Sequence, residues 1–125
     1  MIRLIEFSAG CGADGTSLQG YVRTDYDTLV QTFGEPELGG DKTTAEWVVD
    51  FTYRGWQSEE HDDVDYCTAT IYDWKECSTP MGSYSWHIGG RPGEPVTDLV
   101  EQAIAQKIRG TTGSAKSLNS LEKNI

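Results

Sequence analysis

The sequence has few of the residues that build metal and disulfide sites. Its 125 residues include three cysteines (Cys11, Cys67 and Cys77) and two histidines (His61 and His87). An odd number of widely spaced cysteines is not a disulfide framework, so free thiols in a reducing cytosol are expected. Structural zinc sites use close pairs such as C-x2–4-C or H-x3–5-H, and these positions form none. We therefore expect no metal and no cofactor.

Long apolar runs and basic residues are also scarce. No apolar stretch approaches the ~20 residues that cross a membrane as a helix. Ten Lys and Arg residues stand against 20 Asp and Glu, for a net charge of −10. This balance disfavours direct binding to nucleic acid or to an anionic membrane. The acid excess either keeps the protein soluble or forms a face that binds a basic partner.

Arrangements for catalysis are missing as well. Ser85 and His87 are two residues apart on one expected strand, ~7 Å and too far for the base to activate the nucleophile. "IGGRPGEP" leads into an expected helix N-terminus, where anions bind well. Arg91 is the one supporting cation there, and Glu94 and Asp98 oppose an anion. We expect a non-enzymatic protein, with Arg91 as the residue that would serve a small ligand.

Alternating apolar residues predict four strands. They cover residues 18–24, 45–53, 65–74 and 84–90. The residues expected to face the core are Val22, then Trp47, Val49, Phe51 and Tyr53, then Cys67, Ala69 and Ile71, then Tyr84, Trp86 and Ile88. Tyr21, Tyr72, Trp74 and His87 fall on the opposite faces of their strands.

Two helices are also predicted. The first follows Thr24, a candidate cap with Asp27 three residues on, and Gly34 ends it. The second begins near Pro95 and is ended by Gly110. Its apolar stripe comprises Val96, Leu99, Val100, Ala103, Ile104 and Ile108.

The resulting order, β-α-β-β-β-α, predicts an α+β two-layer domain. An antiparallel sheet would carry both helices on one face. We expect residues 1–17 to form a flexible N-terminal arm, residues 18–110 the single domain, and residues 111–125 a disordered tail. Within the arm, "MIRLIEF" is either a short strand or a loosely held segment.

The acidic loop between the second and third strands is the candidate partner-binding site. "EEHDDVD" concentrates five acids within seven residues. Such a loop is either a solvated surface or a patch that steers a basic partner, and a neighbouring tryptophan would supply an apolar anchor. The residues proposed to bind the partner are Trp56, Glu59, Glu60, Asp62, Asp63, Asp65 and Trp74.

One resemblance adds context. With "SLQGYVRTDYDTLVQTFGEP", "AEWVVDF", "ATIYDWKE" and "WHIGG" in this order, residues 17–108 resemble small phage- and prophage-encoded proteins of unassigned function. "TIYDWK" and "WHIGG" are the most specific segments, while the stretch before Ser17 and the loop around Glu59 depart from the group. The resemblance implies a phage accessory protein in the host bacterial cytoplasm, and it brings no catalytic motif.

Two functions follow as hypotheses. The first is a protein that binds and inhibits a host protein with a basic surface, such as a component of a defence system, through its acidic surface. The second is a homo-oligomeric binder that sequesters a small nucleotide signal, with Arg91 at its site.

Overall fold

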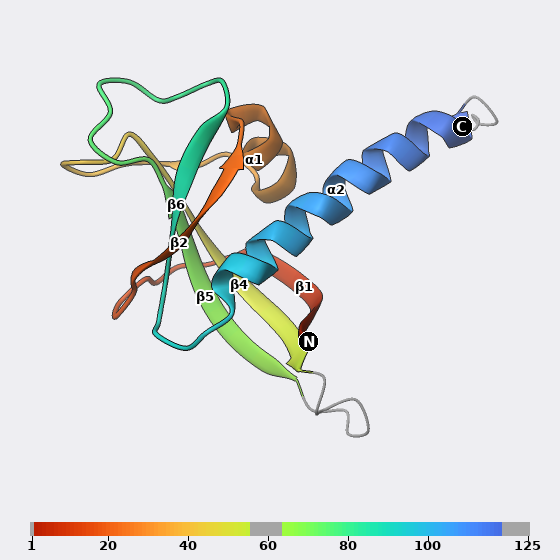
Figure 1. The fold of residues 1–125 in the computed structure, drawn as a ribbon, viewed down its shortest axis with the longest axis horizontal. Coiled ribbons are helices and arrows are strands. Elements are labelled where there is room, and N and C mark those ends of the chain that lie inside the picture. Colours follow the sequence, from red (N-terminus) through yellow and green to blue (C-terminus); the bar gives the residue numbers. More distant parts are fainter. Residues whose placement is uncertain (1, 56–63, 119–125) are drawn as a thin grey trace.

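The chain folds into one antiparallel sheet and two helices. The computed structural model describes residues 2–55 and 64–118, with side chains through Ile108. The elements are β1 (Ile2–Ala9), β2 (Ser17–Thr24), α1 (Tyr26–Phe33), β3 (Glu37–Leu38), β4 (Ala45–Gly55), β5 (Asp65–Tyr72), β6 (Tyr84–Gly90) and α2 (Val96–Leu118). The six-stranded sheet has the order β1-β4-β5-β6-β2, and β3 pairs with β4 (Figure 1). The predicted α+β class is confirmed, with two strands more than expected.

One face of the sheet carries the core. Trp47, Val49 and Phe51 of β4 are each at most 3% exposed. Their direct partners on β5 are the smaller Ile71, Ala69 and Cys67, all buried. The core-facing residues are therefore those that strand alternation predicts.

Both helices pack on this face. α1 brings Phe33 to 6.4 Å from Phe51, measured between ring centroids. α2 begins against Gly20 and Gly90, where a Cβ would collide with Thr97 and Val96 respectively. The two helices also contact each other, so the layer they form covers the core. Within residues 2–55 and 64–118, no helix lies on the opposite face of the sheet.

The N-terminal segment belongs to the sheet, which corrects the expectation of a flexible arm over residues 1–17. β1 pairs with β4 from Ile2↔Gly55 to Ala9↔Val49, with an irregularity between Leu4 and Glu6. That irregularity places both Leu4 and Phe7 against the core, although they are three residues apart. The alternation of period two is broken at this point, so the sequence pattern could not decide between a short strand and a loose arm.

The cap of α1 also differs from the prediction. Asp25, not Thr24, is the N-cap, and its carboxylate accepts a hydrogen bond from the Thr28 N–H at 2.9 Å. The hydrogen bonds from Thr28 lower the pKa of Asp25. At the other end, Gly34 takes a φ of 89° and donates its N–H to the Val30 carbonyl. The predicted role of Gly34 in ending this helix is confirmed.

α2 is longer than predicted. Its buried stripe runs through Ile104 as expected, but Ile108 is 53% exposed. The helix passes Gly110 and ends at Leu118, because an interior glycine costs only ~1 kcal/mol and does not force a stop. Residues 111–118 are thus helical, which corrects that part of the predicted tail. Figure 1 shows the second half of α2 projecting beyond the sheet. None of the helices described is long and apolar enough to span a membrane.

The connection between β1 and β2 crosses the sheet, since these strands are its two opposite edges. We call residues 10–16 the strap. The Gly10 N–H donates to the Val48 carbonyl, and a Cβ on Gly10 would meet the side chains of Val48 and Asp50. At its other end, the Asp14 carbonyl accepts a hydrogen bond from Arg91. Val48 and Asp50 alternate with the core residues of β4, so the strap lies on the face without helices, here called the strap face.

Candidate functional site on the strap face

A lateral row of four side chains crosses the strap face. Tyr21 of β2 pairs with His87 of β6, His87 pairs with Tyr72 of β5, and Tyr72 pairs with Glu46 of β4. Ring centroids are 4.8 Å apart for Tyr21 and His87, and 5.3 Å apart for Tyr72 and His87. Cross-strand neighbours of this kind stabilise one another, so the row is a continuous surface that ends in a carboxylate.

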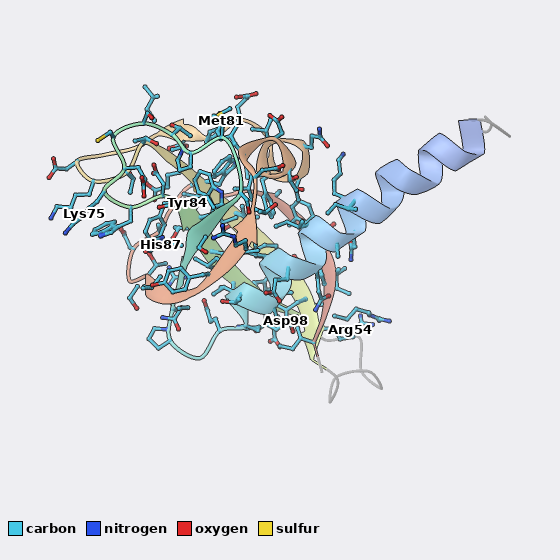
Figure 2. The ribbon with its side chains drawn as sticks, turned by 45° about the horizontal axis from the view of Figure 1, so that its top comes forward. Arg54, Lys75, Met81, Tyr84, His87 and Asp98 are labelled. Carbon is cyan, nitrogen blue, oxygen red and sulfur yellow. The ribbon has the colours of Figure 1, made fainter. Side chains whose placement is uncertain are left out.

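Trp74 extends the row just beyond the end of β5. Its ring lies 6.3 Å from Tyr72 and 6.4 Å from His87, between centroids. The Lys42 ammonium lies 5.9 Å from the Trp74 ring centroid, within the range of a cation–π contact. Trp74 is 42% exposed and Tyr21 is 52% exposed. Figure 2 shows His87, together with Lys75, on the side of the molecule away from the projecting end of α2.

A buried carboxylate holds Trp74 and Lys42 in place. Asp73 is fully buried and accepts hydrogen bonds from the Thr44 N–H at 2.7 Å, the Thr44 hydroxyl and the Ala45 N–H. The next turn is tied to the same loop, because the Lys75 N–H donates to the Lys42 carbonyl at 2.7 Å. These bonds join the loop before β4 to the loop after β5. The positions of Lys42 and Trp74 are therefore set by backbone contacts.

A hollow of about 230 Å³ opens beside the row, and we call it the Glu46 hollow. A Cβ on Gly89 would lie 2.5 Å from the Thr70 hydroxyl and 3.5 Å from the Tyr72 ring, so glycine at this position leaves room between strap and sheet. The hollow is lined by Thr16, Ser17, Thr43, Glu46, Thr70, Tyr72, Trp74 and Gly89.

The electrostatics of the row are set by partial burial. The pKa of Glu46 is raised, first by desolvation and then by repulsion from Glu37. Glu37 is the direct cross-strand partner of Glu46. Burial lowers the pKa of His87, so its imidazole is neutral at pH 7. It also raises the pKa of Tyr72. The row thus presents neutral aromatic rings beside one carboxylate that is only partly hydrated.

A second hollow of about 480 Å³, here called the Arg91 hollow, lies beside the C-terminal half of β1, where Glu6, Phe7 and Ser8 line it. Arg91 reaches it from the end of β6, and Tyr66, which is 71% exposed, forms part of its wall. Glu6 and Asp50 line the same space, and Thr68 donates a hydrogen bond to Asp50 at 2.7 Å. The Arg91 charge is accordingly accompanied by two carboxylates.

The predicted site is only partly described. The predicted site residues Trp56, Glu59, Glu60, Asp62 and Asp63 lie outside the residues that the structure describes. Asp65 is exposed at the start of β5, while Trp74 follows the end of that strand. Seven strand steps of ~3.3 Å separate Asp65 from Tyr72, about 23 Å in all. Asp65 and Trp74 therefore do not belong to one compact site.

Sequence reasoning did not single out Tyr21, Tyr72, Glu46 or Lys42 as site residues. The sequence feature that could have pointed to these strand residues was their alternation with the core residues, which places them on the outward face of the sheet. Strand alternation gives the face of each residue but not the neighbour of each strand. The row became visible only with the order β4-β5-β6-β2.

The thiols and potential metal ligands are dispersed. Among the side chains that the structure describes, residues 2–55 and 64–108, no three His, Cys, Asp or Glu lie close enough together to hold a metal ion. Cys67 is buried, and burial raises its pKa to about 12. A thiol with that pKa remains protonated at neutral pH and is a poor nucleophile.

The chain matches no protein-family model, and it shows no significant match to a curated protein or to a solved structure. Its function is therefore inferred below from the chemistry of the strap face.

Proposed function

We propose that this chain is a non-enzymatic binding protein that docks onto another protein through its strap face. The observation that carries the proposal is the exposure of Tyr21 and Trp74, 52% and 42%, on the strap face, opposite α1 and α2. Aromatic side chains dominate the energetics of protein interfaces. Here Tyr21 is the direct strand partner of His87, and the Trp74 ring packs beside Tyr72 and His87. This fixed arrangement lowers the entropy lost on binding.

The charge of the chain supports a protein partner with a basic surface. A net charge of −10 repels phosphates and steers basic proteins towards the chain. In the phage setting that the resemblance implies, the partner would be a bacterial host protein, and binding in the host cytoplasm would inhibit it. The acidic loop would then speed association. This role for Glu59, Glu60, Asp62 and Asp63 remains a prediction.

The Arg91 hollow favours a second candidate, the binder of a small nucleotide signal. Its volume of about 480 Å³ falls within the usual range for ligand pockets, ~300–1,000 Å³. However, Glu6 and Asp50 line the same hollow and would repel a phosphate at the distance where Arg91 attracts it. We therefore prefer the protein partner.

Affinity capture from bacterial host lysate tests the proposal. The tagged chain is compared with a strap-face variant that carries Tyr21→Ser and Trp74→Ala, and captured proteins are quantified by mass spectrometry. Ile108→Ser is the matched control, because Ile108 is equally exposed at 53% but lies on α2. We expect a protein captured by the parent and the control to be lost by the strap-face variant. Equal capture by all three would contradict docking through this face.

A kinetic arm tests the acidic loop separately. Replacing Glu59, Glu60, Asp62 and Asp63 by their amides should slow association with the captured protein. It should also weaken the salt dependence of the rate between ~50 and 300 mM, where screening changes strongly. An unchanged rate over that range would make the loop a solubilising surface only.

A further inference from the structure

The Glu46 hollow combines a carboxylate with aromatic walls. Glu46, Tyr72 and Trp74 all line it, and Glu46 and Tyr72 are direct cross-strand partners. Thr16, Thr43 and Thr70 line the remaining walls. A planar cation that stacks on an aromatic face and forms paired hydrogen bonds with a carboxylate fits this chemistry, and the guanidinium of arginine has both properties.

The hollow already has a cation at its rim. The Lys42 ammonium lies 5.9 Å from the Trp74 ring centroid. This contact indicates that the Trp74 ring is accessible to a positive group. Lys42 itself is exposed, so an incoming cation could displace it at little cost. The contact between Lys42 and Trp74 is of the same cation–π type that a positively charged partner side chain would make with Trp74.

Glu46 is poorly compensated within the chain. It is opposed directly by Glu37 across the β3–β4 pair, and like charges in that position destabilise a sheet. Within the described residues, burial and Glu37 are what shift the pKa of Glu46, and no Lys or Arg is near enough to lower it. A guanidinium in the hollow would neutralise this repulsion. A phosphate or a lipid headgroup of negative charge would increase it.

We propose that the Glu46 hollow receives an arginine side chain from the partner protein, with its guanidinium stacked on Trp74 and Tyr72 and paired with Glu46. This inference rests on the proposed function, since it names the residue type by which the strap face recognises its basic partner. The aromatic row towards Tyr21 then contacts the partner surface around that arginine.

The test uses a small probe and does not require the partner. Nα-acetyl-arginine methylamide is titrated into the full chain, and binding is followed by the NMR shifts of the Trp74 indole N–H and the Glu46 and Tyr72 amides. The citrulline counterpart is the matched control probe, because a neutral urea replaces the guanidinium. We expect saturable shifts at these three residues with the arginine probe and at least about tenfold weaker binding of the citrulline probe, as ionic hydrogen bonds require.

Three variants sharpen the test. Glu46→Gln should weaken binding of the arginine probe about fivefold, the upper range for a solvent-accessible ion pair. Glu101→Gln, an exposed acid on α2, should leave it unchanged. Lys42→Gln should strengthen binding about twofold, because it removes the internal competitor for the Trp74 ring. A purely structural role of Lys42 would not increase affinity.

Several results would overturn the inference. Equal binding of both probes would show that the guanidinium is not recognised. NMR shifts centred away from Glu46 and Trp74 would show that the probe binds outside the Glu46 hollow. Weaker binding in the Lys42→Gln variant would contradict competition. If the arginine probe fails while the strap-face variant still loses its partner, the proposed function stands and only arginine recognition fails. If the probe binds but the variant with Tyr21→Ser and Trp74→Ala captures the partner as well as the parent does, the proposed function fails.

Discussion

Glu37 and Glu46 lie directly opposite each other where β3 pairs with β4. Two like charges at facing strand positions weaken the sheet, and desolvation further raises the pKa of Glu46. Nothing in the packing of the core requires a carboxylate here, because Glu46 faces away from Trp47 and the helices. A locally unfavourable charge beside exposed aromatic rings is typical of a binding site, where stability is sacrificed for recognition.

Glu46→Gln should raise the melting temperature at pH 7. The ordinary pKa of Glu46 is 4.5, and it is higher in the folded protein. The folded state therefore binds the proton more tightly, and the free energy of unfolding falls as the pH rises through the folded pKa. The gain from Glu46→Gln should be present at pH 7 and vanish below pH 4.5, where Glu46 is protonated in both states. Thermal melts over this range, with Glu101→Gln as control, measure it, and a gain that persists in acid would contradict the assignment.

Trp47→Ala should destabilise the domain by about 3–5 kcal/mol. Trp47 is 3% exposed, and its ring centroid lies 5.4 Å from that of Trp86. Its indole N–H donates to the Gly34 carbonyl at 2.7 Å, so the substitution also releases the end of α1. Urea unfolding compares it with Val48→Ala on the opposite face of β4. A loss no greater than that of Val48→Ala would argue against a core role for Trp47.

Alkylation should distinguish the three thiols. Cys11 and Cys77 are exposed, whereas Cys67 is buried with its pKa raised to about 12. Iodoacetamide at pH 8 should modify Cys11 and Cys77 in the native protein and Cys67 only after unfolding, because the thiolate is the reactive form. Peptide mass spectrometry reads out each site. Early modification of Cys67 would show that β5 is open to solvent.

Asp73→Ala should destabilise the domain and disturb the site together. The substitution leaves the Thr44 and Ala45 N–H groups without their acceptor, and hydrogen bonds to charged groups contribute ~1.5–3 kcal/mol each to stability. The loop that carries Lys42 would separate from Trp74, which should change the Trp74 indole N–H shift. Asp98→Ala, an exposed acid on α2, is the control. An unchanged Trp74 signal in folded Asp73→Ala would mean that Asp73 does not position the ring.

The core could be predicted because strand alternation reports burial directly. Trp47, Val49 and Phe51 are buried as their spacing indicates. For β1 the pattern leaves a short strand and a loose arm as alternatives, because an irregularity puts Leu4 and Phe7 on one face without regular alternation. α2 extended past Gly110 because a glycine lowers helix stability without ending a helix by itself. Local sequence patterns therefore predicted the core residues correctly. They were insufficient at the irregularity in β1, where alternation is interrupted, and at Gly110, where the helix continues.

The candidate site could be predicted only in part, because it depends on which strands are neighbours. Tyr21 and His87 are 66 positions apart in the chain, yet they are direct partners across β2 and β6. Sequence patterns placed each on its outward face but carried no information on strand order. Trp74 was chosen for its proximity to an acidic loop, whereas its neighbours in the fold are Tyr72, His87 and Lys42.

Hydrogen–deuterium exchange in the presence of the captured partner tests docking through the strap face most directly. The account predicts that binding slows exchange in the strap, in β2 and β6, and around Trp74. It predicts no change in α2, which lies on the opposite face of the sheet. Slower exchange confined to α2, with the strap and the end of β5 unchanged, would contradict the account.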